Sequence, residues 1–211
     1  KGMAGMTMTK IGIARTVIEV SFNAKLIDKT PPDDKRWLTQ GFDLYEVTPD
    51  QLCEAINQGC SYSYKFEGGI RKSENFLGAD LISVDIDGGR TITETLADPI
   101  VQSYGSIWYT TPSHTPDRHR FRLIFILPFT VTDPNDLKAA ARSLSRRLGG
   151  DMSATDAARL FYGSTGSEPT DLGGQLSEAY LEELIKDGRV APIQDSISGN
   201  RPTTNRSQMP L

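Results

Sequence analysis

The sequence is poor in cysteine, with only Cys53 and Cys60 among 211 residues. Their spacing fits neither a zinc-ligand pattern nor the disulfide framework of a small secreted domain, so we expect two structural thiols. Long apolar runs are also missing: no stretch reaches the roughly 18 apolar residues of a membrane span, and the N-terminal residues lack the apolar core of a signal peptide. These absences predict a cytoplasmic protein without a membrane partner.

An excess of basic charge is missing too. The formal net charge is −4, from 23 Lys and Arg against 27 Asp and Glu. This excludes a protein that grips nucleic acid by bulk electrostatics, although a local basic groove remains compatible with it. The composition, 37% hydrophobic and 24% charged, is that of a globular protein. We expect one domain over 1–190 and, because Pro, Ser, Asn and Thr dominate the end, a disordered tail or linker over 191–211 that leads to helicase or other fused domains.

Helix signals occur at three places. Thr48-Pro49-Asp50-Gln51 combines an N-cap, a first-turn proline and a capping-box glutamine, and Gly59 ends the predicted helix. A second helix opens at Asp133-Pro134 and ends at Gly149-Gly150, and a third runs over 177–186 and is closed by Gly188. Asp98-Pro99 interrupts a shorter helical segment that follows residue 87.

Strand signals alternate with these helices. The predicted strands cover 17–20, 41–47, 79–87, 105–111, 120–127 and 160–162. Residues 60–78 read as a polar connection with glycines. Hairpin-like connections within this order predict an α+β fold rather than a doubly wound parallel sheet.

The most informative motif is the pair Asp85 and Asp87 at the end of the apolar strand 79–87, followed directly by Gly88 and Gly89. The i, i+2 spacing places both carboxylates on one face, about 6.5–7 Å apart along the strand. Such a pair suits hard cations like Mg²⁺ or Mn²⁺, although Asp and Gly also favour a purely structural turn. A calcium loop is excluded, because Arg90 and Leu96 stand where Gly and Glu are required.

Three further elements can join this pair. His114 lies in a loop between two strands, and Arg120 and Arg122 share one strand face, which suits either a polyphosphate or a salt-bridged outer surface. Asp151 or Asp156 can complete a three-carboxylate site, or serve as turn residues. Arg159 can meet a triphosphate or template phosphate, or pair with Asp156.

In this order the motifs resemble those of the archaeo-eukaryotic primase (AEP) and primase-polymerase superfamily. The matching residues are Val84-Asp85-Ile86-Asp87, Ser113-His114, the later acid, the Arg-Phe-Arg strand, and the segment Asp-x4-Asp-x2-Arg-Leu-Phe-Tyr-Gly-Ser. They look most like catalytic domains of plasmid, phage and CRISPR-associated primase-polymerases. The resemblance covers about residues 60 to 165.

The resemblance implies an RRM-like, palm-like antiparallel sheet with flanking helices and a metal site within 80–165. It implies that Asp85, Asp87 and either Asp151 or Asp156 hold two Mg²⁺ or Mn²⁺ ions, which activate a 3′-hydroxyl while pyrophosphate leaves an incoming NTP or dNTP. The partners are then a single-stranded DNA template and a primer strand.

The same resemblance assigns nucleotide-binding roles. Ser113 and His114 contact the phosphates of the incoming nucleotide. Weaker candidates for phosphate or template contacts are Arg120, Arg122, Arg159 and Lys72. The aromatic residues Trp108, Tyr109 and Phe161 either stack on a base or sugar or belong to the core.

Two alternatives stay open at this point. The Asp-x-Asp-Gly motif also resembles haloacid-dehalogenase phosphohydrolases, in which Asp85 attacks phosphorus and Asp87 acts as acid and base. Against this, Gly89 stands where that family has Thr, and Lys138 is the one lysine between the two acidic motifs. A catalytically silent single-stranded nucleic-acid-binding module is the other alternative, and it predicts salt-sensitive binding that survives loss of both acids.

Overall fold

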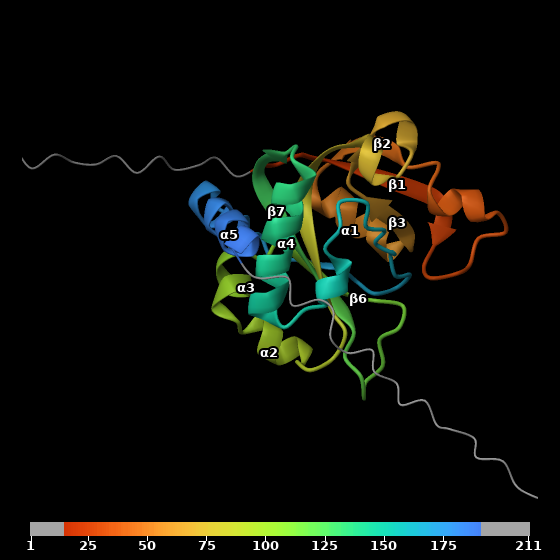
Figure 1. Cartoon of the computed structure of the whole chain (residues 1–211). Coiled ribbons are helices and arrows are strands. Elements are labelled where there is room, and N and C mark those ends of the chain that lie inside the picture. Colours follow the sequence, from red (N-terminus) through yellow and green to blue (C-terminus); the bar gives the residue numbers. More distant parts are fainter. Residues whose placement is uncertain (1–14, 191–211) are drawn as a thin grey trace, which may run out of the picture.

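Two antiparallel sheets form the framework of the computed structural model, which describes residues 15–190 (Figure 1). The smaller sheet has the order β2-β1-β3 and the larger one the order β4-β5-β7-β6-β8. The strands are β1 Ile18–Ile27, β2 Asp43–Val47, β3 Cys60–Ser63, β4 Lys65–Phe66, β5 Phe76–Ile86, β6 Ile107–Thr110, β7 Phe121–Val131 and β8 Thr170–Asp171. Every strand pair within the described residues is antiparallel, so the predicted α+β fold is confirmed.

Helices pack against both sheets. They are α1 Pro49–Asn57, α2 Ile92–Leu96, α3 Pro99–Tyr104, α4 Pro134–Leu148 and α5 Glu178–Val190, with short 3₁₀ turns η1 Lys35–Leu38, η2 Glu67–Gly69, η3 Ser73–Asn75 and η4 Met152–Ala154. Helix α4 packs on β5 and α5 on β7, whereas β1 and the smaller sheet contact the opposite side of β5 (Figure 1). The central strands are therefore enclosed from both sides.

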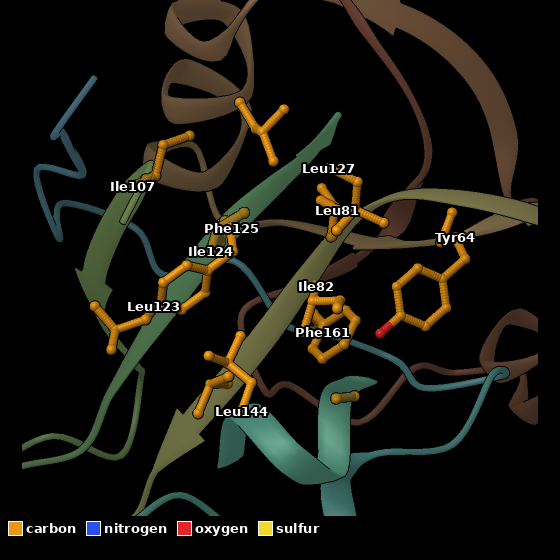
Figure 2. Close-up of a cluster of buried hydrophobic side chains, with 14 of the residues drawn as sticks. Tyr64, Leu81, Ile82, Ile107, Leu123, Ile124, Phe125, Leu127, Leu144 and Phe161 are labelled. Carbon is orange, nitrogen blue, oxygen red and sulfur yellow. The ribbon is translucent and has the colours of Figure 1, made fainter. Parts of the chain in front are cut away.

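This enclosure explains the apolar composition of β5 and β7. Strands covered on both faces carry continuous apolar runs rather than alternating ones. Leu144 of α4, Ile82 of β5, and Phe161 and Tyr64 belong to one buried cluster (Figure 2). The core therefore extends through the larger sheet, and the acidic end of β5 emerges from a rigid support.

Both predicted N-caps are present. Thr48 accepts from the backbone N–H of Gln51, whose side chain accepts from the backbone N–H of Thr48, which completes the capping box of α1. Asp133 caps α4 by accepting from the N–H of Asn135. Gly149 ends α4 in the left-handed conformation (φ 72°), as expected for a helix C-terminus.

The prediction of a polar connection over 60–78 is wrong, because this segment contains β3, β4 and the start of β5. Its polar and aromatic residues alternate, and the strand lies between two layers, so Tyr62, Tyr64 and Phe66 are buried together with Ser61 and Ser63. The serines favoured a loop in the sequence interpretation, although the strand is buried on both faces.

Two further boundaries differ from the prediction. Helix α5 does not end at Gly188 but continues to Val190. A Cβ on Gly188 would lie 1.9 Å from the carbonyl oxygen of Ala139, so this glycine permits close contact with α4 rather than stopping the helix. The predicted strand 160–162 is reduced to a single bridge between Phe161 and Tyr62.

The predicted tail over 191–211 lies outside the described residues. Within residues 15–190, no helix is long and apolar enough to cross a membrane.

Candidate active site

A cavity of about 390 Å³ opens where β5, β7 and the segment after α4 meet. Nine of its lining residues are charged: Lys29, Arg71, Asp85, Asp87, Arg120, Arg122, Asp151, Asp156 and Arg159. Five bases against four acids give this lining a small positive balance, while the whole chain is negative at −4. The cavity is therefore the local basic groove that the overall charge did not exclude.

The acidic pair stands at the end of β5, as predicted. Asp85 is the penultimate residue of the strand and 8% exposed, whereas Asp87 follows the strand and is exposed. Ser83, two residues earlier on the same face, contacts the hydroxyl of buried Tyr62 at 3.0 Å. Both acids line the cavity, so the i, i+2 spacing brings them to one site.

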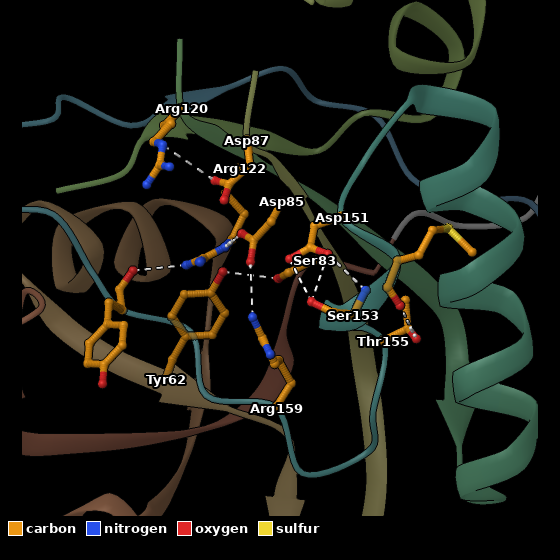
Figure 3. Close-up of polar contacts among 12 residues, drawn as sticks. Tyr62, Ser83, Asp85, Asp87, Arg120, Arg122, Asp151, Ser153, Thr155 and Arg159 are labelled. Carbon is orange, nitrogen blue, oxygen red and sulfur yellow. Dashed lines mark hydrogen bonds and ion pairs between the residues drawn. The ribbon is translucent and has the colours of Figure 1, made fainter. Parts of the chain in front are cut away.

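A row of three polar side chains crosses the sheet beneath the cavity. Asp85 of β5 lies opposite Arg122 of β7, and Arg122 lies opposite Tyr109 of β6. Arg122 Nε donates to Asp85 Oδ1 at 2.5 Å (Figure 3). Nη1 donates to the Tyr109 hydroxyl and to the Tyr162 carbonyl, the latter at 2.9 Å. Directly opposed residues on one sheet face form such contacts because their Cβ atoms are close.

Burial and the neighbouring charges shift the pKa values of Arg122 and Tyr109 in this row. Burial by itself lowers the pKa of Arg122, but the Asp85 carboxylate and the Tyr109 phenol outweigh it and raise that pKa well above its ordinary value. Burial raises the pKa of Tyr109, against the opposing effect of Arg122. Arg122 is therefore a permanent cation whose Nε and Nη1 groups are bonded to Asp85, Tyr109 and the Tyr162 carbonyl.

Two other arginines approach the acids more loosely. Arg159 Nη2 lies 3.9 Å from Asp85 Oδ2, and Arg120 Nε lies 4.0 Å from Asp87 Oδ1 (Figure 3). The Nε atoms of both arginines are buried and have no hydrogen-bond partner among the described residues. Arg159 thus approaches Asp85 rather than forming the alternative pair with Asp156.

Asp151 reaches Asp85 through its backbone. Its N–H donates to the carbonyl of Asp85 at 2.8 Å, near the end of β5. Gly150 permits this approach, because a Cβ there would lie 2.6 Å from Val84 Cγ1. The Asp151 carboxylate accepts from the N–H and hydroxyl of Ser153 and caps η4 (Figure 3).

Asp156 also lines the cavity, but its carboxylate accepts from the N–H of Ala158 at 3.0 Å. Both candidate third acids therefore lie at the site, and Asp151 is the one whose chain is bonded to the acidic strand.

The Ser-His loop contributes Ser113 to the cavity lining. His114 stands just behind it: Nδ1 accepts from the backbone N–H of Arg120 at 3.1 Å, which places the proton of the neutral ring on Nε2. Lys72 does not line the cavity. It is exposed and lies 3.8 Å from Glu74.

The aromatic candidates divide according to burial. Tyr109 and Phe161 are fully buried, so the core interpretation holds for both and neither surface is open to a base. Trp108 is half-buried and packs against the core. Tyr162, which the sequence did not single out, is the aromatic residue among those lining the cavity.

Sequence reasoning also missed Lys29 and Arg71 in the cavity lining. Arg71 donates to the carbonyls of Leu38 and Ala158 and so connects η1 to the segment that carries Asp156. Within residues 15–190 no carboxylate pairs with Arg71, and burial lowers its pKa, opposed by Asp156 and Tyr162. The sequence interpretation chose the neighbouring Lys72 instead, and no local signal distinguished the two.

The donor set suits a hard cation, because the cavity offers carboxylate oxygens and no thiol. The carboxylates are not gathered into a cage: among the described residues, no group of three His, Cys, Asp or Glu side chains lies close enough together to hold a metal ion. Asp85 faces Arg122, Asp87 faces Arg120 and Asp151 caps η4. The residues therefore fit Mg²⁺ or Mn²⁺ in chemistry, once their side chains turn away from these partners.

The model of the VapE N-terminal domain family matches residues 59–181, more than half of the chain. The recognition of an AEP-type domain from the sequence is thereby confirmed. The chain belongs to the VapE N-terminal domain family.

Among solved structures, the AEP domain (PP-N190) of the cyanophage S-2L primase-polymerase is similar to this chain, with 12% identity and a TM-score of 0.48 over 81% of this chain and 89% of that chain. No curated protein matches the sequence.

Proposed function

We propose that the chain is the catalytic domain of a template-directed nucleotidyltransferase, a DNA primase or DNA polymerase that adds NTP or dNTP to a 3′-hydroxyl and releases pyrophosphate. The observation that carries this proposal is the placement of the strand-end acids Asp85 and Asp87 in one cavity with Asp151, Ser113 and several arginines. Membership of an AEP-type family supports the same reaction class.

Asp85 and Asp87 would hold the divalent ions, and Asp151 is the better third ligand because its backbone is bonded to Asp85. When bound, Mg²⁺ or Mn²⁺ would supply electrostatic stabilisation of the charge that develops during phosphoryl transfer. Arg122 holds Asp85 Oδ1 from beneath and leaves Oδ2 toward Arg159 and the cavity.

Ser113 and Arg120 would bind the phosphates of an incoming nucleotide; both line the cavity that also contains Asp87, and Arg120 lies 4.0 Å from Asp87. His114 keeps its Nε2–H as a donor and, through Nδ1, positions the backbone of Arg120. A guanidinium offers phosphate a planar fork of donors, and a hydroxyl adds a further hydrogen bond.

The test is incorporation of labelled NTPs and dNTPs on single-stranded DNA with Mg²⁺ or Mn²⁺, with and without a primer. We expect metal-dependent products from the parent and a loss of at least about 100-fold in Asp87→Asn and in Asp85→Asn. Asp87 is exposed, so its variant keeps the fold even if Asp85→Asn perturbs the buried row. Asp117→Asn, an exposed acid of the Ser-His loop outside the cavity lining, is the matched control.

Products without a primer would identify a primase, and products only with a primer would identify a polymerase. Absence of product under all these conditions, with single-stranded DNA binding that survives loss of both acids, would replace the proposal with a silent binding module. Family membership leaves the aspartate-nucleophile alternative without support.

A further inference from the structure

The arginines around the acidic pair are of two kinds. Arg122 is 5% exposed, and its Nε and Nη1 donate to Asp85, Tyr109 and Tyr162. Arg120 and Arg159 instead face the acids across 4.0 and 3.9 Å, with 20% and 33% of their side chains exposed. Arg122 belongs to the framework, whereas the other two are loosely held at the cavity wall.

The loose pair also has unused hydrogen-bonding capacity. The Nε–H groups of Arg120 and Arg159 are buried without a partner among the described residues. A buried donor without an acceptor is unfavourable, and a partly exposed ion pair near 4 Å is weak. A phosphate oxygen at the cavity would therefore be a better partner for either guanidinium than its present carboxylate, because it can accept a charge-assisted hydrogen bond.

We propose that Arg120 and Arg159 are built-in counter-ions of Asp87 and Asp85, respectively. A nucleotide polyphosphate binds these arginines and separates them from the acids, so that the acids become available to a divalent metal ion. Nucleotide binding and metal binding then depend on each other. This inference rests on the proposed function and specifies how that site is loaded. It accounts for the absence of a preformed three-ligand cluster among the described residues, because the carboxylates face guanidiniums.

The proposal has a thermodynamic corollary. If polyphosphate raises the affinity for metal by a given factor, metal must raise the affinity for polyphosphate by the same factor. Without metal, the acids compete with phosphate for the arginines and weaken nucleotide binding. With metal, the same acids hold the cation and strengthen it. One substitution should therefore have opposite effects under the two conditions.

The experiment measures binding of a fluorescent dATP analogue by anisotropy, in EDTA and in Mn²⁺. We expect Asp87→Asn to tighten binding about 3- to 10-fold in EDTA, and to weaken it by at least as much in Mn²⁺. Asp156→Asn is the matched control, since it removes a cavity acid that has no ion pair with an arginine among the described residues and reports the general effect of charge.

A double-mutant cycle separates the ion pair from this general effect. In the Arg120→Gln background, Asp87→Asn should tighten EDTA binding no more than Asp156→Asn does. Arg120→Gln by itself should tighten Mn²⁺ binding without nucleotide, followed by electron paramagnetic resonance, about threefold or more. Asp87 and Arg120 lie at the cavity wall rather than in the core, so both variants are expected to fold.

Weaker binding of Asp87→Asn in both conditions, an additive cycle, or unchanged Mn²⁺ affinity in Arg120→Gln would overturn the counter-ion role. If the parent still incorporates nucleotides in that case, the proposed function stands and only this inference fails. A parent that binds no nucleotide with or without Mn²⁺ overturns both. If Asp87→Asn has opposite effects on nucleotide binding in EDTA and in Mn²⁺ but the parent incorporates no nucleotide, the counter-ion role stands and the proposed polymerase activity is wrong.

Discussion

Strand β5 carries two buried aspartates with opposite surroundings. Asp80 lies in the middle of the strand, where its carboxylate accepts from Arg15 at 2.9 Å, from Thr130 at 2.6 Å and from the N–H of Glu19 at 2.8 Å, and lies 3.0 Å from Lys65 Nζ. Asp85 lies at the strand end with one close partner, Arg122, and a cavity on its other side.

The difference shows that burial of an acid does not by itself mark a functional site. Both Asp80 oxygens are engaged by several donors from β1, β4 and β7, so that site is closed to any further ligand. At Asp85 one oxygen faces only a distant guanidinium, and neighbouring donors lack partners. Incomplete satisfaction beside a cavity, rather than burial, distinguishes the second acid.

The largest expected difference between the two acids is in the free energy of unfolding, and it is measured at Asp80. Asp80→Asn should lower the free energy of unfolding by about 3 kcal/mol, because it leaves the charges of Arg15 and Lys65 without their buried counter-ion. Urea unfolding measures this loss. Asp87→Asn, in contrast, should change stability by less than about 0.5 kcal/mol. Equal losses in the two variants would mean that the middle of the strand and its acidic end do not differ as described.

Gly150→Ala should act at the acidic end of β5, next to Val84 and Asp85. Its Cβ would approach Val84 Cγ1 to 2.6 Å and the Asp85 carbonyl to 3.0 Å, so Asp151 has to move away, with a destabilisation of about 2 kcal/mol. Nucleotide incorporation should fall beyond what stability explains. Gly149→Ala is the control: its Cβ meets only Arg90 at 3.5 Å, so the left-handed backbone alone should cost about 1 kcal/mol. Full activity of Gly150→Ala would remove Asp151 from the site.

The contribution of Asp80 and its hydrogen-bond partners to the free energy of unfolding should depend on pH. Burial raises the pKa of Asp80, but hydrogen bonds from Thr130, Glu19, Lys65 and Arg15 outweigh it and lower that pKa. A lowered pKa in the folded state stabilises the protein above the unfolded value near 4, and this contribution disappears as pH falls through the folded pKa, at about 1.4 kcal/mol per unit. The stability gap between the parent and Asp80→Asn should therefore narrow below about pH 4 in urea titrations. A gap constant down to pH 2 contradicts this.

The smallest expected effect compares two surface lysines. Lys29 lines the cavity and Lys72 does not. Lys29→Ala should weaken binding of the fluorescent dATP analogue about two- to threefold, whereas Lys72→Ala should leave it unchanged. A loss in Lys72→Ala alone would restore the sequence-based prediction for that residue.

Local patterns in the sequence were sufficient for the acidic end of β5, for the start of α1 and for the end of α4. The alternation over Asp85 and Asp87, the Gly149-Gly150 stop and the Thr48 capping box each depend on neighbours a few residues apart, and the structure has them as expected. The strand over 60–63 was missed because residues far away in the sequence bury both of its faces, serines included. A pattern of neighbouring residues does not indicate such burial.

The roles of the arginines could not be read in the same way. Arg120 and Arg122 are equivalent in a strand pattern, yet the register of β7 between β5 and β6 places Arg122 between Asp85 and Tyr109 and leaves Arg120 at the cavity wall. Arg71 and Lys72 carry the same charge at adjacent positions, and only the contacts of Arg71 with η1 and with the segment after Asp156 separate them. Site residues that depend on register or tertiary contact thus need the structure.

The row that joins Asp85, Arg122 and Tyr109 across three strands also constrains how this sequence can diverge. A lineage that loses Arg122 leaves a buried carboxylate and a buried phenol without their common cation, and a lineage that loses Asp85 leaves a buried guanidinium without its counter-ion. We therefore expect the three positions to change together among descendants of a common ancestor. Cavity-wall positions such as Lys29 are free to drift one at a time.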